Sequence, residues 1–294
     1  MSVEGRIAIV TGAGGGLGRD HALYLAGKGA RVVVNDLDLA AAERVAAEIA
    51  TRGGHALAVG GSVTEEDAAA AMVQQALDSW GRVDILVNNA DILRDKSFAK
   101  MTIADFRLVV DVHLMGAAIM TKAVWDTMRA QNHGRIVMTT SSSGLYGNFG
   151  QANYGAAKMA LVGLMQTLAI EGEKYGIRVN CLAPTAATQM THGVLPDASL
   201  AALDPALVSP GLLALVGEDA PTRAILCAGA GHFAAAHVTL TEGVQIDEGG
   251  DAGEELAARW AQVVDRRDEI VPAYGFVQAE REVASALARS TLAA

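Results

Sequence analysis

The chain has 294 residues, of which 33 are acidic and 23 basic, so its formal net charge is -10 at pH 7. This charge repels phosphate backbones and anionic headgroups, and aromatic residues make up only 4% of the chain; neither nucleic acid nor a membrane is an expected partner. No apolar run reaches the length of about 18 residues that spans a bilayer, and no signal-peptide pattern opens the chain, so we expect a cytoplasmic protein. Cys181 and Cys227 stand in no metal-ligand spacing, and no metal site is expected.

Short β-branched runs alternate with alanine-rich helical stretches, a pattern typical of βαβ units. Together they predict an α/β fold: a single Rossmann-type, doubly wound, seven-stranded parallel sheet with helices on both faces and a C-terminal helical extension. The expected strands are Ile7–Val10, Val32–Asn35, Ala56–Val59, Ile85–Asn88, Ile136–Thr139, Val179–Leu182 and Val244–Asp247, and the expected helices cover 17–28, 38–51, 65–80, 103–130, 152–174 and 218–228.

A glycine-rich turn, Thr11–Gly18, connects the first expected strand to the first helix. Backbone amides and the helix dipole at such a turn can hold a pyrophosphate, and Gly12, Gly16 and Gly18 have the required spacing. Asp36 ends the second strand, where a carboxylate can accept hydrogen bonds from ribose hydroxyls and would repel a 2′-phosphate, so we expect NAD rather than NADP. Alternatively, Asp36 caps the following helix.

Tyr154 and Lys158 lie one helical turn apart, so both side chains point from one face of the helix. A free tyrosine needs roughly 4 kcal/mol of help to ionise at pH 7, and an ammonium group about 4 Å away supplies energy of that order. The pair is therefore a candidate acid/base group, with Ser141 upstream. By itself the spacing leaves an accidental pair open.

Beyond the sixth strand, the segment at about 185–217 is rich in apolar residues but poorly periodic. We expect it to be a lid over an apolar substrate within a catalytic domain covering 1–250; the alternative is a set of short helices packed in the core. Residues 251–294 are expected to form a helical extension packed on the same domain or in a subunit contact, interrupted around Pro272, Tyr274 and Gly275.

Several motifs together resemble the short-chain dehydrogenase/reductase family: the glycine turn, Asn88-Asn-Ala90, Ser141, Tyr154-x-x-x-Lys158, Pro184 and Asp247-Glu-Gly-Gly250. Strings such as Gly12–Arg19, Ile92–Asp95 and Tyr146–Tyr154 resemble more closely the group of that family that acts on (3R)-hydroxyacyl-CoA. The resemblance implies a catalytic set of Ser141, Tyr154, Lys158 and His113. It implies cofactor contacts from Gly12, Gly16, Leu17, Gly18, Asp36, Ser62, Val63, Asn89, Tyr154, Lys158, Ala186, Ala187 and Gln189.

The sequence departs from the general family pattern at four places, one of which is Thr185 after Pro184, where the family has glycine. Asp91 replaces the glycine after Asn88-Asn-Ala90 and puts a carboxylate near the cofactor. His113 stands where the family has an asparagine that supports a proton relay, and it either serves that relay or packs within a helix. Ser62 replaces an acidic adenine contact.

The expected function is NAD-dependent interconversion of a secondary alcohol and a ketone, with a 3-hydroxyacyl-CoA or a similarly apolar substrate. The alternatives are a hydroxysteroid or other hydrophobic alcohol as substrate, or, from another class, a dinucleotide-binding scaffold with little turnover. Arg94, Lys96 and Lys100 either meet CoA phosphates or are solvated surface charges. The resemblance implies a homodimer or homotetramer that pairs the helices at 103–130 and 152–174.

Overall fold

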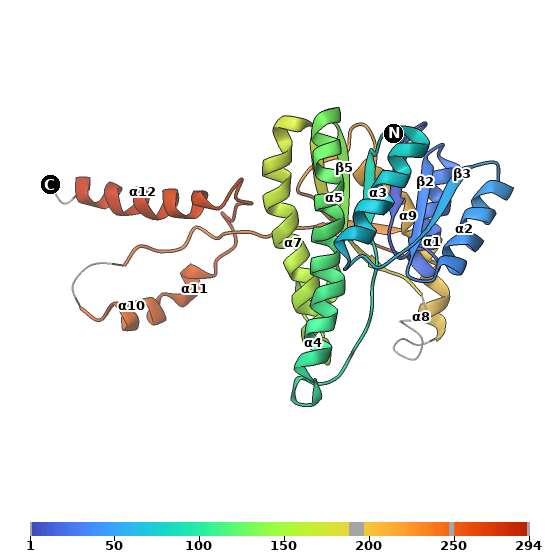
Figure 1. The fold of residues 1–294 in the computed structure, drawn as a ribbon. Helices are drawn as coiled ribbons and strands as arrows, with labels where there is room; N and C mark the ends of the chain where they lie inside the picture. Colours follow the sequence, from blue (N-terminus) through green and yellow to red (C-terminus); the bar gives the residue numbers. More distant parts are fainter. Residues whose placement is uncertain (1, 188–196, 247–249, 293–294) are drawn as a thin grey trace. The chain divides into compact units, whose positions relative to one another are not determined.

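The computed structural model describes residues 2–187, 197–246 and 250–292. It divides into two compact units, Met1–Ala236 and His237–Ala294 (Figure 1). The division follows Ala236, whereas the sequence suggested a catalytic domain ending at residue 250. Among the helices of the described residues, none is both long and apolar enough to cross a membrane.

The first unit is built on one eight-stranded sheet of order β3-β2-β1-β4-β5-β6-β7-β8. Its first six strands lie where the sequence predicted strands: β1 (Ile7–Val10), β2 (Arg31–Asp36), β3 (His55–Gly60), β4 (Ile85–Asn88), β5 (Gly134–Thr139) and β6 (Ile177–Thr185). Neighbouring pairs are parallel from β3 through β7, and the reversal of strand order between β1 and β4 marks a doubly wound sheet.

The edge of the sheet beyond β6 differs from the prediction. The seventh strand is β7 (Ile225–Gly229), which overlaps the range 218–228 expected to be helical, and β8 (His232–Ala236) pairs with it antiparallel. The strand expected at Val244–Asp247 is wrong, because the described residues 244–246 have no strand structure. A short apolar run is compatible with either a helix or a strand. Here the run forms a strand because it pairs with Cys181–Thr185 of β6.

Helices cover both faces of the sheet (Figure 1). On one face pack α3 (Glu66–Trp80), α5 (Gly116–Gln131) and α7 (Ala152–Gly172), and on the other α1 (Gly16–Gly27), α2 (Leu39–Thr51) and α9 (Ser209–Val216). Strand residues alternate between the two cores: Ile7 and Ile9 face the first, and Ala8 and Val10 the second. The parallel strands are thus buried on both faces, which explains their continuous apolar runs.

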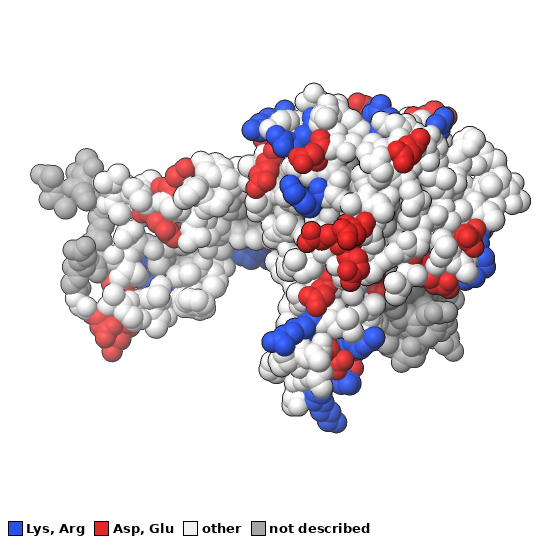
Figure 2. Space-filling model, viewed as in Figure 1, with Lys and Arg blue, Asp and Glu red and all other residues white. Residues whose placement is uncertain are grey.

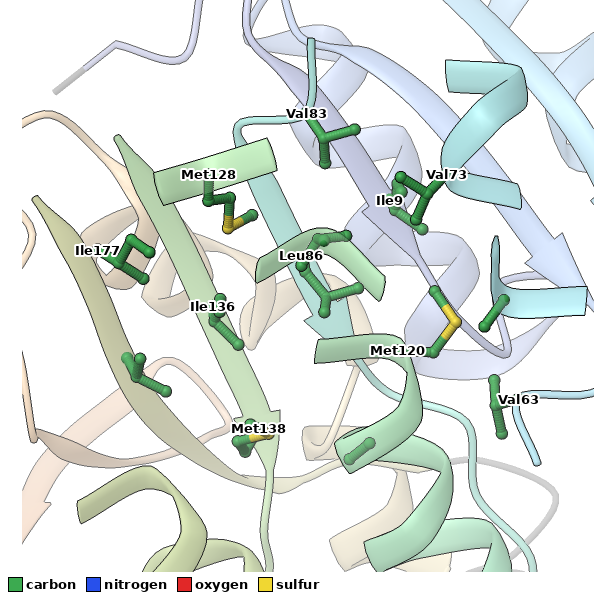
Figure 3. Packing of buried hydrophobic residues seen from close by; sticks show 14 of the residues in the cluster. Ile9, Val63, Val73, Val83, Leu86, Met120, Met128, Ile136, Met138 and Ile177 are labelled. Atoms are coloured by element: carbon green, nitrogen blue, oxygen red, sulfur yellow. The ribbon is translucent and has the colours of Figure 1, made fainter. Parts of the chain in front are cut away.

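Methionines fill much of the first core (Figure 3). Met120 and Met128 on α5 belong to the same buried cluster as the strand residues Leu86 and Ile136, and Met138 lies on β5 itself. Their unbranched side chains adapt to the gaps between helix and sheet. The strands that lead to the carboxyl edge of the sheet are therefore packed against a dense apolar core.

The helix expected over 103–130 is interrupted. It consists of α4 (Ile103–Val110), a π-helical turn η2 (Asp111–Met115) and α5, with His113 inside the turn. Gly116 follows this turn, where a Cβ atom would come within 2.6 Å of Val63 Cγ2. Such turns are frequent at functional sites.

The segment at about 185–217 is only partly described. It contains α8 (Asp197–Ala202), a short 3-10 turn η4 (Pro205–Leu207) and α9, whose Leu212, Leu215 and Val216 are buried in the second core. This part matches the alternative of short core-packing helices. The expected lid at 188–196 lies outside the described residues, and lid function stays a prediction.

The second unit contains α10 (Ala252–Ala258), α11 (Trp260–Val263) and α12 (Phe276–Leu292). A backbone bridge joins Leu240 to Ile270, and the Thr241 hydroxyl donates to the Val263 carbonyl at 2.7 Å. Helical structure was expected here, as was the interruption near Pro272, since α12 begins only at Phe276. Packing of this extension on the first unit stays a prediction.

Short connections complete the first unit. A 3-10 turn, η1 (Phe98–Lys100), precedes α4, the short helix α6 (Ser142–Tyr146) follows β5, and a second 3-10 turn, η3 (Glu173–Tyr175), follows α7. Because β1, β4, β5 and β6 run parallel, their carboxyl ends lie at one edge of the sheet. The residues that follow these strands form the candidate site.

Candidate active site

The turn after β1 folds too tightly for any residue but glycine at two points. Gly12 has φ +61°, and a Cβ atom there would approach Ala90 Cα to 2.7 Å; a Cβ atom on Gly18 would come within 2.5 Å of Asn89 Nδ2. Gly16 also has a positive φ of +51°. The turn thus leaves an open cradle at the amino end of α1, which fits the pyrophosphate of a dinucleotide.

Asn89 fixes this turn to the next strand. Its side chain donates to the Thr11 carbonyl at 3.0 Å and to the Gly12 carbonyl at 3.2 Å, while the Thr11 hydroxyl accepts from the backbone of Asn89 and Ala90. The sequence suggested Asn89 as a cofactor contact. Its hydrogen bonds show a structural role in shaping the cradle.

Asp36 lies beside the same turn. Its carboxylate accepts from Gly14 N at 2.9 Å and from Asp38 N at 3.0 Å. The cap of α2 is Asp38, which accepts from Ala40 N, so the alternative that Asp36 caps this helix is not what the structure shows. A carboxylate placed here favours ribose hydroxyls over a 2′-phosphate.

The remaining candidate cofactor residues lie in several different environments. Ser62 bonds Thr64 through its hydroxyl at 2.7 Å, and Val63 is buried against Gly116. Leu17 packs against the second core, Ala186 is buried after β6, and Ala187 N donates to the Leu203 carbonyl at 2.6 Å. Gln189 lies outside the described residues.

The candidate catalytic residues gather at the carboxyl end of β5. Ser141 caps α6, and its hydroxyl accepts from Ser143 N at 3.2 Å. Tyr154 and Lys158 lie one turn apart on α7, with the ammonium nitrogen 5.3 Å from the centre of the phenol ring. Lys158 is fully buried and donates to the Thr139 carbonyl at 2.8 Å.

Asp91 lies at the centre of this group. Its Oδ2 is 2.9 Å from Lys158 Nζ and accepts from the Tyr154 hydroxyl at 3.3 Å, while Oδ1 is 3.1 Å from His113 Nε2. His113 Nε2 also lies 2.9 Å from the Ile92 carbonyl. The Ile92 backbone N–H also points at this nitrogen, at 3.1 Å, so Nε2 lies between one donor and two acceptors. The sequence flagged Asp91 and His113 separately; the fold brings them together.

The sequence suggested that Lys158 would help Tyr154 to ionise, but in the structure the pKa of Tyr154 is raised. Burial of the phenol, followed by the negative charge of Asp91, raises the pKa of Tyr154 well above its usual value, and the Ser141 hydroxyl only partly opposes this. Burial and the neighbouring Lys158 charge lower the pKa of His113 to about 4. At neutral pH the structure therefore contains a protonated phenol and a neutral imidazole.

A small cavity lies behind Lys158. Its volume is about 10 Å³, and its lining includes Asn88, His113, Thr139 and Lys158. Asn88 Oδ1, His113 Nδ1 and Thr139 Oγ1 are buried and find no hydrogen-bond partner among the described residues. The space is close to that of one water molecule, with polar atoms on several sides. Sequence reasoning missed Thr139, whose only signal was its position at the end of a strand.

The basic group at Arg94, Lys96 and Lys100 is exposed near the start of α4. Lys96 pairs with Asp105 at 3.3 Å. Figure 2 shows basic side chains interspersed with acidic ones at this end of the molecule. Within the described residues, no cluster of His, Cys, Asp or Glu side chains is arranged to hold a metal ion.

A doubly wound sheet with a dinucleotide cradle and a Ser-Tyr-Lys group at one edge defines a Rossmann-type oxidoreductase. A family model described as short chain dehydrogenase matches residues 6–198. The chain belongs to the short-chain dehydrogenase/reductase family, whose enzymes bind a nicotinamide dinucleotide.

Individual relatives support the same assignment. A putative short-chain type dehydrogenase/reductase of Mycobacterium tuberculosis is 46% identical over 90% of this chain and 95% of its own length. The mouse peroxisomal multifunctional enzyme type 2 is 49% identical over 74% of this chain, but the match covers only 31% of that enzyme.

Solved structures agree with the fold. The full-length peroxisomal multifunctional enzyme type 2 of Drosophila melanogaster superposes with a TM-score of 0.83 at 36% identity, over 98% of this chain and 50% of that one. A short chain dehydrogenase of Mycobacterium avium gives 0.79 at 36% identity, over 94% of this chain and all of that one.

Proposed function

We propose that the protein is an NAD-dependent dehydrogenase that interconverts a secondary alcohol and a ketone, with a 3-hydroxyacyl-CoA or a similarly apolar molecule as substrate. The observation that carries the proposal is the meeting of Ser141, Tyr154 and Lys158 beside the carboxyl ends of β4 and β5. Their neighbour β1 supplies the cradle for the dinucleotide. Substrate and cofactor are thus brought to one edge of the sheet.

The preference for NAD rests on Asp36. Its carboxylate accepts from Gly14 N within the turn, where the adenosine ribose of a dinucleotide is expected, and the next side chain is the exposed Leu37 rather than a basic residue. A 2′-phosphate would meet this negative charge, and the residue that follows Asp36 supplies no cation to offset it.

In the proposed reaction, Tyr154 exchanges the proton of the reacting oxygen. During oxidation the alcohol O–H bond breaks and the phenolate of Tyr154 takes the proton; during reduction the phenol donates it back. Ser141 donates a hydrogen bond to the oxygen as negative charge develops, and Lys158 stabilises the phenolate. A bound nicotinamide supplies the acceptor or donor of the hydride.

The proposed substrate class is supported by the names of the relatives. The mouse and fruit-fly proteins named above are peroxisomal multifunctional enzymes, and a Synechocystis relative, 42% identical over 66% of this chain, is named 3-oxoacyl-[acyl-carrier-protein] reductase. An acyl thioester with an oxygen function at carbon 3 is consistent with the latter name. The exposed Arg94, Lys96 and Lys100 could contribute charge for a CoA phosphate.

The assembly that we propose is a homodimer or homotetramer. A groove of about 580 Å³ lies on the surface of α5, α7 and η3, lined by Trp125, Arg129, Ile170, Glu171, Glu173, Lys174 and Tyr175. Ile170 is 45% exposed there, and Met159 on the same helix is 40% exposed. Pairing these helices with a second copy would cover these two apolar side chains and the largely charged groove at η3.

The decisive experiment measures NAD and NADP reduction with a panel of 3-hydroxyacyl-CoA thioesters, steroid alcohols and small secondary alcohols. We expect turnover with the thioesters and NAD, and a decrease of roughly 10²–10⁴-fold in kcat for Tyr154→Phe with little change in NAD affinity. Preferred turnover of steroid alcohols would favour the alternative substrate class. NAD binding without turnover of any alcohol would support the scaffold alternative.

A further inference from the structure

Asp91 occupies a position that the proposed chemistry does not require. Three side chains from two other elements converge on its carboxylate: Lys158 and Tyr154 from α7 share Oδ2, and His113 from η2 approaches Oδ1. The carboxylate is largely enclosed, with 16% of the side chain exposed. Water screens charges weakly at such an enclosed position, so the Asp91 charge acts strongly on the groups that contact it.

The Asp91 charge acts on Tyr154 in two ways. The carboxylate accepts a hydrogen bond from the protonated phenol, whereas a phenolate would place a second negative charge 3.3 Å away. The same carboxylate pairs with Lys158, the only cation in the group, and so offsets the positive charge that would stabilise a phenolate. Both effects favour the protonated form of Tyr154.

The other polar neighbours of Tyr154 do not reverse this balance. The Ser141 hydroxyl stabilises the phenolate but carries no charge, and His113, whose ring lies 5.3 Å from the phenol, is neutral at pH 7. Asp95 adds a weaker negative influence and is bound to Gln151 Nε2 at 2.6 Å.

We propose that Asp91 is a positioning residue that holds Tyr154 in its protonated form by hydrogen bonding to it and by pairing with Lys158. Compared with the same site without this carboxylate, alcohol oxidation then begins at higher pH and ketone reduction continues to higher pH. The inference rests on the proposed function, since it assigns the proton-donating state to this site. At neutral pH the phenol already carries the proton that ketone reduction requires, whereas alcohol oxidation requires that this proton first be lost.

Asp91→Asn and Asp91→Gly test the idea. The first keeps the shape and one acceptor oxygen but removes the charge; the second removes the side chain, and the backbone of Asp91 does not lie in the left-handed region, so no strain is relieved. The pH dependence of kcat/KM is measured in both directions for each variant and the native chain. In each direction, kcat/KM changes over the pH range in which Tyr154 loses its proton, and we call this part of the profile its limb. We expect the oxidation and reduction limbs to move together to lower pH, by about one to three units.

Asp95→Asn is the matched control, because it removes a nearby exposed carboxylate that does not contact Tyr154 or Lys158 among the described residues. We expect its limbs to move by less than about 0.3 unit, since solvent screens that charge. A purely structural role of Asp91 would lower kcat without moving the limbs. Coincident limbs in the native chain and both Asp91 variants would overturn the proposal.

A second readout separates this inference from the proposed function. Tyrosine labelled with ¹³C at Cζ reports phenol ionisation without substrate or turnover, and the Tyr154 signal is identified by its loss in Tyr154→Phe. We expect the Tyr154 titration in both Asp91 variants to begin at least about one pH unit lower than in the native chain. If no substrate is turned over, coincident titration curves alone contradict the role of Asp91.

Discussion

Lys158 carries an ammonium group that is only 1% exposed, an arrangement that is costly unless several partners compensate for the lost water. The Thr139 carbonyl and the Asp91 carboxylate provide two such partners, at 2.8 and 2.9 Å. The Lys158 carbonyl in turn accepts from the Thr140 hydroxyl at 2.6 Å, which ties α7 to the end of β5. The position of the ammonium group is therefore fixed by the sheet as well as by its own helix.

At the residue scale, the structure predicts the ionisation of His113. Burial and the Lys158 charge hold its pKa near 4, while the Asp91 charge opposes them. We expect the His113 ring signal in an NMR titration, identified by its loss in His113→Gln, to titrate at about pH 4. In Asp91→Asn it should titrate lower still, because the carboxylate that favours the imidazolium is gone. A native titration near 6.5, the ordinary value, would show that the ring is solvated.

At the scale of elements, the turn between β1 and α1 depends on close backbone approach rather than on glycine content. Thr11 and Asn89 hold the ends of β1 and β4 together, and Gly18 packs against this contact. Gly15 is different: the space around a Cβ atom there is open to 4 Å among the described residues, and its φ of -169° suits any residue.

Gly18→Ala and Gly15→Ala are therefore a matched pair that changes the same turn by one methyl group each. We expect Gly18→Ala to weaken NAD binding by at least about tenfold, because the methyl group displaces Asn89 and opens the cradle. Gly15→Ala should change the affinity by less than about threefold. Calorimetric titration with NAD measures both. Equal losses in the two variants would show that close packing at Gly18 is not what shapes the cradle.

At the scale of the whole molecule, three histidines spread over the first unit are neutral when folded. Burial lowers the pKa of His21 to about 3 and, with neighbouring positive charges, those of His113 and His133 to about 4. His21 lies between α1 and α9, where it bonds Ser209 at 2.8 Å. Each ring gains a proton on unfolding at mildly acidic pH, so folding and protonation are coupled.

We therefore expect the free energy of unfolding to fall as the pH drops from about 6.5 towards 4, since in this range the unfolded chain binds protons that the folded chain does not. The loss from three rings is at most about 4 kcal/mol per pH unit. Urea unfolding at pH 7.5 and pH 5 measures it. His113→Asn should reduce the slope, because one of these three rings is removed. Equal stability at both pH values would contradict the buried, neutral state of these rings.

The sequence by itself determined the first six strands, the dinucleotide turn and the Tyr154–Lys158 pair. These are local features: β-branched runs set the strands, glycine sets the turn, and a separation of one helical turn puts both side chains on one face.

Only the tertiary structure decided the features that depend on contacts between distant segments. Ile225–Gly229 became a strand because it pairs with β6, and Leu212 and Leu215 are buried because α9 packs in the second core. The orientation of Asp91 is of the same kind. Its charge is evident from the sequence, but its effect on Tyr154 follows from the packing of η2, α7 and the end of β4 around one carboxylate.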